Sequence, residues 1–320
     1  TRLWLEKKIK SKKIALALPL KWSSDEKAES NQITPQLLED WLIAPQLIWL
    51  KNINIRPREW FEPIKDLESL KLNELERYKL IRNRLENLIE NISLNKDKNI
   101  EIPIPGKWED LTNGKGILPP EAASVIEIDL LEARWQSLQS ILFKVGRCRS
   151  ELIDFDCNKQ EILFAGEYGL IVDPGRIKSK VVMKAWLIHL HICANGTESK
   201  GTHIITRHHS KNKKNEYEIS LTWKPIEKEE AKKIINDLKK LAQQGLNECW
   251  PIPPESGWAF ANTGKGNFSK GKKAFENKWE GTFNTLGEYK QEEMYICFGM
   301  DCNPSIFLEN KEFKRAFSLL

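Results

Sequence analysis

Acidic side chains that could hold a divalent metal are the first candidates for chemistry in this sequence. Asp154 and Asp156 alternate within a strand-like run, so they share one face of a strand, and with Asp173 they could form a displaced Mg²⁺ site. The acid-x-lysine triplets at 198–200 and 276–278 fit the companion motif of metal-dependent nucleases. With 50 basic and 45 acidic residues such triplets arise by chance, so we predict no metal site and keep an active nuclease as the alternative.

The histidines and cysteines favour structural roles. His189 lies on the apolar face of a predicted helix, where a buried and hydrogen-bonded histidine is the common case, and His191 points elsewhere because it is two residues away. Cys297 and Cys302 have the spacing of half a metal site but no second pair. The six cysteines are scattered through a long chain, which is typical of cytosolic thiols rather than of a disulfide scaffold.

Two basic segments could contact the DNA backbone. Positive side chains surround His203, His208 and His209 and disfavour cation binding there; we predict a solvated loop, with phosphate contact as the alternative. The segment 262–273 is rich in glycine and lysine but lacks a nucleotide phosphate-loop pattern, and we predict a mobile loop with the same alternative. The candidate DNA-binding residues are Arg207, Lys211, Lys213, Lys214, Lys265, Lys270, Lys272 and Lys273.

Composition narrows the class of protein but says little about where a functional site lies. The chain has 320 residues, 40% of them apolar and 30% charged, as in a globular protein with one large domain or two small ones. No uncharged apolar stretch approaches the ~20 residues of a transmembrane helix. The net charge of +5 permits nucleic-acid binding without arguing for it, and most of the 12 tryptophans are expected in the core. Because the start at Thr1 is neither an initiator nor a signal peptide, we expect a fragment of a longer chain.

Helices and short strands must position these groups. Arg77, Arg82 and Arg84 lie on the polar face of one predicted helix, where they are expected to be solvated or ion-paired. Helices are predicted from Thr34 to a break at Pro45, over 70–92, over 180–194, and from 227 to a stop at Gly245.

Strand-like runs lie between these helices, over 151–156, 161–165 and 170–172. The segment 157–160 suits a hairpin turn between the first two runs. Together with the helices, they predict an α/β (α+β) fold in which a small mixed sheet is flanked by helices. A domain boundary is expected near residue 30.

Several blocks occur in a shared order over roughly residues 33–300. The most characteristic are Pro174–Lys178 and then the helix Ala185–Leu190, which reads Ala-Trp-Leu-Ile-His-Leu. Together the blocks resemble the C-terminal domain of the exodeoxyribonuclease V gamma subunit, RecC, in which a Trp-Leu-x-His-Leu helix is characteristic. The other matching blocks are Leu70–Tyr78, Pro253–Ala259, Trp279–Gly281 and Gly287-Glu288.

This resemblance implies an inactive restriction-endonuclease-like (PD-(D/E)XK-type) nuclease fold over 31–320, with 246–320 as a C-terminal extension and 1–30 as a connector from a preceding helicase-like domain. It also implies a non-catalytic, DNA-handling and assembly subunit of a bacterial helicase–nuclease that processes double-strand DNA ends for recombinational repair in the cytoplasm. The implied partners are the beta subunit (a helicase–nuclease), the alpha subunit (a helicase) and DNA, with no membrane. The partner subunits are expected to use Mg²⁺ and ATP, and this chain no cofactor; a protein-interaction module without DNA contact is a further alternative.

Positions matching the family's active relatives lack the expected ligands. Those relatives carry Gly-x-x-x-His on the helix before the sheet, and here Arg82, which cannot ligate a metal, takes the histidine's place. Their Gly-x-x-Asp strand reads Gly166–Gly169, with glycine at the aspartate, and Asp173–Gly175 predicts a turn where a strand with Glu-x-Lys is needed. A cysteine that holds an iron–sulfur cluster in some relatives is Ala44, before Pro45. We therefore expect no catalytic residue and no metal.

Overall fold

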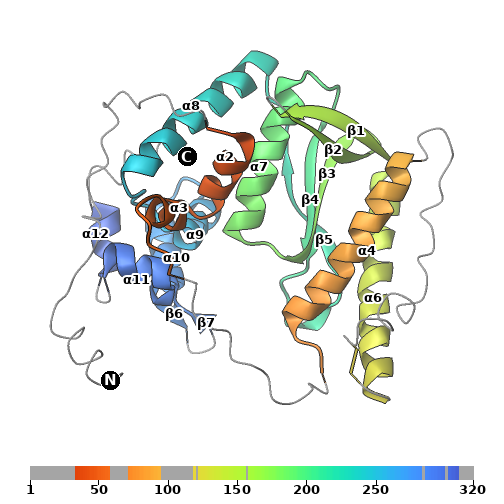
Figure 1. The fold of residues 1–320 in the computed structure, drawn as a ribbon. Helices are drawn as coiled ribbons and strands as arrows, with labels where there is room; N and C mark the ends of the chain where they lie inside the picture. Colours follow the sequence, from red (N-terminus) through yellow and green to blue (C-terminus); the bar gives the residue numbers. More distant parts are fainter. Residues whose placement is uncertain are drawn as a thin grey trace. The chain divides into compact units, whose positions relative to one another are not determined.

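A five-stranded mixed sheet with its strands in chain order is the main β element (Figure 1). The structure is a computed structural model that describes residues 33–57, 71–94, 118–119, 122–155, 158–282, 285–299 and 302–309. Neighbouring strands are antiparallel except β3 and β4, which are parallel and are connected through helix α7 (Ser179–Ala194), as a parallel pair requires. The strands are β1 (Cys148–Phe155), β2 (Asn158–Ala165), β3 (Tyr168–Arg176), β4 (Gly201–Arg207) and β5 (Tyr217–Trp223).

Helices cover both faces of this sheet. In Figure 1, α4 (Glu74–Leu94, orange) and α6 (Ala122–Val145, yellow) lie on one face, and α7 (green) lies on the other. Leu163 of β2 belongs to the core under α4 and α6, whereas the next residue, Phe164, belongs to the core under α7. Since successive side chains of a strand point to opposite faces, this alternation builds two cores. The predicted small mixed sheet flanked by helices is confirmed.

Contacts between residues divide the chain into two compact units. The sheet unit contains the described residues of 62–177 and 185–235, and the helical unit contains those of 1–61, 178–184 and 236–320. Helices α7 and α8 (Lys228–Asn247) contribute residues to both. The boundary predicted near residue 30 and the connector over 1–30 lie outside the described residues.

Aromatic side chains form much of the core of the helical unit. Trp279 makes edge contacts with Phe298 and Phe307, and Trp41 makes one with Trp250. All three tryptophans are buried, as expected for most of them. The other elements of this unit are α2 (Pro35–Ile43), α3 (Pro45–Asn52), α9 (Pro254–Gly264), α10 (Phe268–Glu280), β6 (Gly281–Thr282), β7 (Thr285–Leu286), the 3-10 turn Glu288–Lys290, α11 (Glu292–Phe298) and α12 (Pro304–Glu309).

The ends of several elements differ from the predictions. The cap at Thr34 and the break before Pro45 are confirmed, since Thr34 Oγ1 accepts the Leu37 N–H at 3.2 Å and Pro45 begins α3. The hairpin between the first two strands is confirmed, but its turn is not at the predicted 157–160, because Asn158 already pairs with Phe155 as the first residue of β2. The stop at Gly245 is also wrong, because α8 continues to Asn247.

Helix α4 begins four residues later than predicted. Asn73 and Glu76 form a reciprocal cap: the Glu76 N–H donates to Asn73 Oδ1 at 2.9 Å, and the Asn73 N–H donates to Glu76 Oε2 at 2.7 Å. These two bonds satisfy donors that the first helical turn leaves free, so they fix the start at Glu74. This start places Glu74, Arg77, Tyr78 and Arg82 on successive turns of one helix.

Candidate functional site

A chain of polar contacts joins α4 to β3. Tyr78 on α4 donates to Asp173 Oδ2 on β3 at 3.1 Å, and Arg82, one turn further along α4, donates to the Tyr78 hydroxyl at 3.1 Å. The other oxygen of Asp173 accepts the backbone N–H of Gly175 at 2.7 Å. Burial raises the pKa of Tyr78, so the phenol stays a neutral donor at pH 7. Both oxygens of Asp173 therefore have protein donors.

Asp173 lies within a strand, so the turn predicted at 173–175 is wrong. β3 continues to Arg176, with a register shift against β4 between Val172 and Arg176. Such an irregularity bends a strand and redirects its side chains. If Asp173 were the acid of an acid-x-lysine motif, the lysine would stand two residues later. That residue is Gly175, where a Cβ would come within 2.8 Å of Asp173 Oδ1. The strand exists as that motif requires, but the lysine does not.

A second carboxylate, Glu74, is held by three arginines. Its Oε1 accepts from Arg77 at 2.7 Å and from Arg134 of α6 at 3.1 Å, and its Oε2 pairs with Arg207 at the end of β4. Burial alone would raise the pKa of Glu74, but hydrogen bonds and charge from Arg134 and Arg207 lower it to about 2. Three guanidinium groups around one carboxylate repel a divalent cation, so Glu74 is a poor metal ligand here.

A buried ion pair fastens α4 to α6 beside this carboxylate. Arg77 donates through Nε and a terminal nitrogen to the two oxygens of Glu127, at 2.8 and 2.7 Å. The hydrogen bonds raise the pKa of Arg77 and lower that of Glu127, so both stay charged. Arg84 is also buried, with its guanidinium 5.1 Å from the centre of the Trp135 ring. Ion pairing, one of the two roles predicted for these arginines, is confirmed for Arg77 and for Arg84, which pairs with Glu132 at 3.4 Å. The other role, a solvated face, applies to neither of the two.

Only part of the displaced metal site proposed from the acids lies within the described residues. Within the described ranges, no group of three histidine, cysteine or acidic side chains lies close enough to hold a metal ion. Asp154 lies on β1 with its carboxylate 3.7 Å from Lys159, and Asp156 lies outside the described residues. The triplet at 198–200 lies in a loop, and that at 276–278 lies within α10, as predicted.

The two histidines of α7 have structural roles, as predicted. His189 is fully buried, its Nδ1 is 2.9 Å from Thr202 Oγ1, and burial lowers its pKa to about 4. His191 points elsewhere and stacks on Phe155 at 4.1 Å between ring centres. Neither ring is available for chemistry.

The residues of the first predicted DNA-binding group lie in two different environments. Arg207 is bound to Glu74 and has only 11% of its side chain exposed. Lys211 and Lys213 lie in the 3-10 turn Lys211–Lys213, with Lys213 paired to Glu216 at 3.4 Å, and Lys214 is exposed. His203, predicted to be in the same loop, is instead a residue of β4.

The second group lies on a helical hairpin rather than in the predicted mobile loop. Lys265 has a left-handed backbone, with φ of 42°, and connects α9 to α10. Lys270, Lys272 and Lys273 lie in the first half of α10, which has no acidic residue in its first turn. Lys272 approaches Glu276 at 3.9 Å, and the other three lysines are exposed. This is the more open of the two predicted basic groups.

Comparison with protein-family models shows to which family the chain belongs. The family model described as the RecC C-terminal domain matches residues 30–265. The chain belongs to the RecC C-terminal domain family. RecC is a subunit of the RecBCD complex, exodeoxyribonuclease V, so the RecC assignment implies partner subunits. A search of curated proteins gives no match.

The RecC match includes the whole polar cluster of α4, α6, β3 and β4, and it ends in the α9–α10 connection. The RecC block that reads Trp-Leu-x-His-Leu lies in the part of α7 that belongs to the sheet unit. No helix in the described part of this RecC-family chain is long and apolar enough to cross a bilayer.

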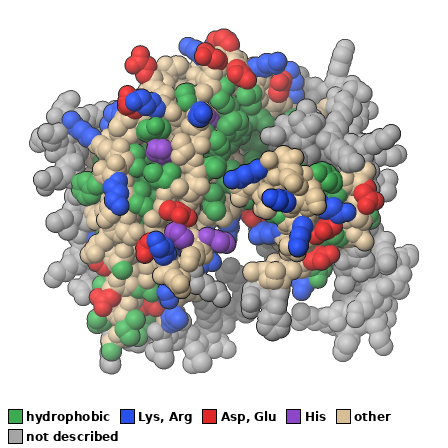
Figure 2. Space-filling view, turned by 180° about the vertical axis from the view of Figure 1, so that it is seen from behind, with side chains coloured by type: hydrophobic (Ala, Val, Ile, Leu, Met, Phe, Trp, Pro, Cys, Tyr) green, Lys and Arg blue, Asp and Glu red, His purple; other side chains and the backbone are tan. Residues whose placement is uncertain are grey.

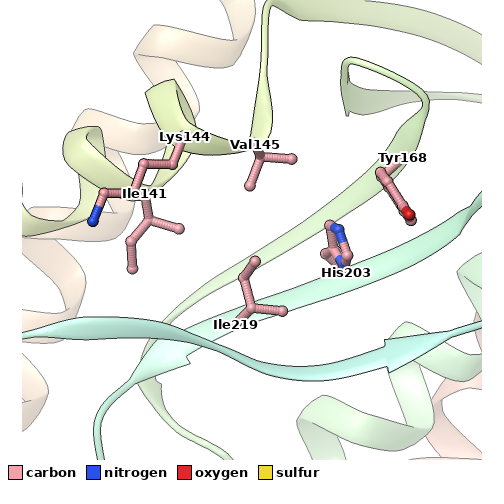
Figure 3. Close-up of a pocket in the computed structure, with 6 residues that line it drawn as sticks. All are labelled: Ile141, Lys144, Val145, Tyr168, His203 and Ile219. Atoms are coloured by element: carbon pink, nitrogen blue, oxygen red, sulfur yellow. The ribbon is translucent and has the colours of Figure 1, made fainter.

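A cavity of about 430 Å³ is the site that sequence reasoning missed (Figure 3). It opens beside the sheet and is lined by side chains from α6, β3, β4 and β5 of the RecC-family chain. Tyr168 and His203 stack on each other there, with ring centres 4.0 Å apart and planes at 19°. Since its walls come from four elements, no local pattern in the sequence indicates it. The lining residues are Ile141, Lys144, Val145, Tyr168, His203 and Ile219.

Proposed function

We propose that this RecC-family chain is a non-catalytic, DNA-handling and assembly part of a bacterial helicase–nuclease that processes double-strand DNA ends for recombinational repair in the cytoplasm. The observation that carries the proposal is the contact chain Arg82–Tyr78–Asp173. A cation, a phenol and one carboxylate with a protein donor on each oxygen make a poor Mg²⁺ site, because metal-dependent cleavage needs several free acids and a lysine.

The topology supports an inactive nuclease fold of the PD-(D/E)XK type. In that fold the histidine of the leading helix and the acid-x-lysine strand serve one metal site, so the matching positions must lie close together. Here Arg82 of α4 and Asp173 of β3 are joined through a single side chain, Tyr78. This proximity supports the interpretation that the two positions belong to one former site whose ligands have been replaced.

Assembly and DNA guidance are the roles that such a scaffold can still perform. We assign the catalytic work to the partners: a beta subunit with helicase and nuclease activity and an alpha subunit with helicase activity, which use ATP and Mg²⁺. This chain needs no cofactor for binding partners or strands. A negatively charged backbone would be bound through lysines such as Lys265, Lys270 and Lys273 rather than through a metal.

The test is nuclease activity of the purified 320-residue chain on linear duplex and single-stranded DNA, with Mg²⁺ or Mn²⁺. We expect no degradation, because no metal would be held at Asp173 to activate a water. The variant Asp173→Ala distinguishes cleavage by this chain from cleavage by a contaminating nuclease, because the substitution cannot affect a contaminant. Cleavage that is stopped by a chelator and lost in Asp173→Ala would contradict the proposal and favour the active-nuclease alternative.

A further inference from the structure

The cavity beside the sheet has one aliphatic wall and one aromatic wall. In Figure 3, Ile141 and Val145 lie across an open space from His203 and Ile219, and Tyr168 lies behind His203. The stacked Tyr168–His203 pair makes the aromatic wall flat and stiff, because each ring limits the rotation of the other. A space of this size and shape suits a flat ring stacked between an imidazole and aliphatic side chains.

The aromatic wall of the cavity is oriented by a hydrogen bond and is uncharged. His203 Nδ1 is 2.8 Å from Thr222 Oγ1, which fixes the orientation of the ring. Burial lowers the pKa of His203, so the imidazole is neutral at pH 7. A neutral imidazole stacks on a neutral heterocycle without the cost of desolvating a charge.

Among the residues that line the cavity, Lys144 carries the one permanent charge, and it is positive. None of the six lining residues is acidic, and Lys144 is exposed, with no ion pair inside the described segments. Its amine extends away from His203 in Figure 3. A ligand that placed its ring in the cavity and an anion outside, near Lys144, would satisfy both features. A nucleotide unit of a single strand has this division into a flat ring and a charged phosphate.

We propose that this cavity binds an unpaired nucleobase of single-stranded DNA, stacked against His203, with a neighbouring phosphate near Lys144. The inference rests on the proposed DNA-handling function and deepens it by naming a site for the separated strand. It predicts that the chain distinguishes a strand with bases from the same sugar–phosphate chain without them, which backbone contacts alone cannot do.

The test is fluorescence anisotropy of the 320-residue chain with a short oligothymidylate and with an oligonucleotide of the same length made of abasic units. Wild type is expected to bind the first about 10-fold more tightly, since a stacked base contributes on that order. His203→Leu removes the imidazole face, and Ile219→Phe fills the cavity from a position that is 42% exposed. Each should abolish most of the preference for bases.

Two controls keep the result interpretable. Phe143→Leu changes an exposed aromatic residue of α6 that does not line the cavity, and it should leave the preference unchanged. Thermal unfolding of every variant shows that it is folded.

Each other outcome has a distinct meaning. Equal binding of both oligonucleotides by wild type would overturn the nucleobase site and leave the DNA-handling function standing. Absence of any DNA binding at low salt would overturn both. If His203→Leu and Ile219→Phe weaken assembly with the partner subunits and leave base preference intact, the cavity receives a protein side chain and the inference is wrong.

Discussion

Glu74 shows how one carboxylate can be the common partner of arginines from three elements. Arg77 is already balanced by Glu127, so Glu74 is the counter-charge that Arg134 and Arg207 share. Arg134 is 2% exposed, and burial is the main reason that its pKa is lowered. Removing the carboxylate would leave two guanidinium groups close together, one of them inside the protein, which is costly.

The first prediction at this scale concerns acid. The pKa of Glu74 in the folded chain, about 2, is below its ordinary value of 4.5. A lowered pKa means that its contribution to the free energy of unfolding is present above pH 4.5 and is lost as the pH falls toward 2. Because 54% of the side chain is exposed, water screens the interaction, and we expect about 1 kcal/mol.

Urea titrations from pH 6 to pH 2 measure this contribution as the difference between wild type and Glu74→Gln. The difference should be largest near pH 6 and should shrink toward pH 2. Glu86→Gln is the matched control, because Glu86 pairs only with the exposed Arg82 on the same helix. A constant difference at all pH values would mean that Glu74 does not act through its charge.

The missing histidine of the family pattern could be read from the sequence, but the contacts made at and around that position could not. Arg82 occupies the position of a histidine that the family pattern marks, so a single residue type was enough to argue against a metal. The Glu74 network joins α4, α6 and β4, and its members carry no local signal of their association. Buried arginines look like surface arginines in a helical pattern, which is why the sequence could not decide between solvation and ion pairing for Arg77 and Arg84.

At the scale of elements, Gly245 illustrates a glycine placed for packing rather than for a turn. It lies inside α8, and a Cβ at this position would be 2.1 Å from Nε1 of Trp41. Trp41 is 2% exposed and has little room to move. The glycine therefore permits close approach of α2 to α8.

Gly245→Ala should destabilise the chain although alanine is the better helix former. Helix propensity favours alanine by about 1 kcal/mol, while forcing a methyl group into the indole costs about 1–3 kcal/mol or more. At 2.1 Å we expect the steric term to win, giving a net loss of about 1–2 kcal/mol in chemical denaturation. Lys233→Ala, an exposed site on the same helix, should change stability by less than about 0.5 kcal/mol. Stabilisation by Gly245→Ala would show that the indole shifts freely.

The spacing of apolar residues predicted the elements whose ends have local caps. It did not predict the ends of elements where packing decides them. The start of α2 follows from Thr34-Pro35, and α7 was predicted to within one residue from its apolar spacing. No prediction was made for α6, whose apolar residues extend around the helix to exposed positions such as Ile126 and Phe143. The α9–α10 hairpin was read as a loop because glycine and lysine dominate its sequence, yet Gly264 and Gly271 let the two helices come close.

At the scale of the whole molecule, the charge is nearly balanced and mixed. The net charge is only +5, and on the face shown in Figure 2 basic and acidic side chains are interspersed over much of the surface. A balanced surface gives little long-range attraction for DNA, so affinity must come from local groups of lysines. The α9–α10 hairpin carries such a group in Lys265, Lys270, Lys272 and Lys273.

Replacing these four lysines by glutamine should weaken binding to single-stranded DNA and flatten its salt dependence. Each lost phosphate contact lowers the slope of log affinity against log salt by about 0.7 for a single strand. The matched control replaces Lys228, Lys232, Lys233 and Lys240 of α8 by glutamine, which changes the net charge equally at another surface. Anisotropy titrations over a range of salt concentrations should give a reduced slope for the hairpin variant and a nearly wild-type slope for the control. If both variants lose the same slope, net charge rather than the hairpin attracts the strand, and if neither loses any, the strand is bound elsewhere on the chain.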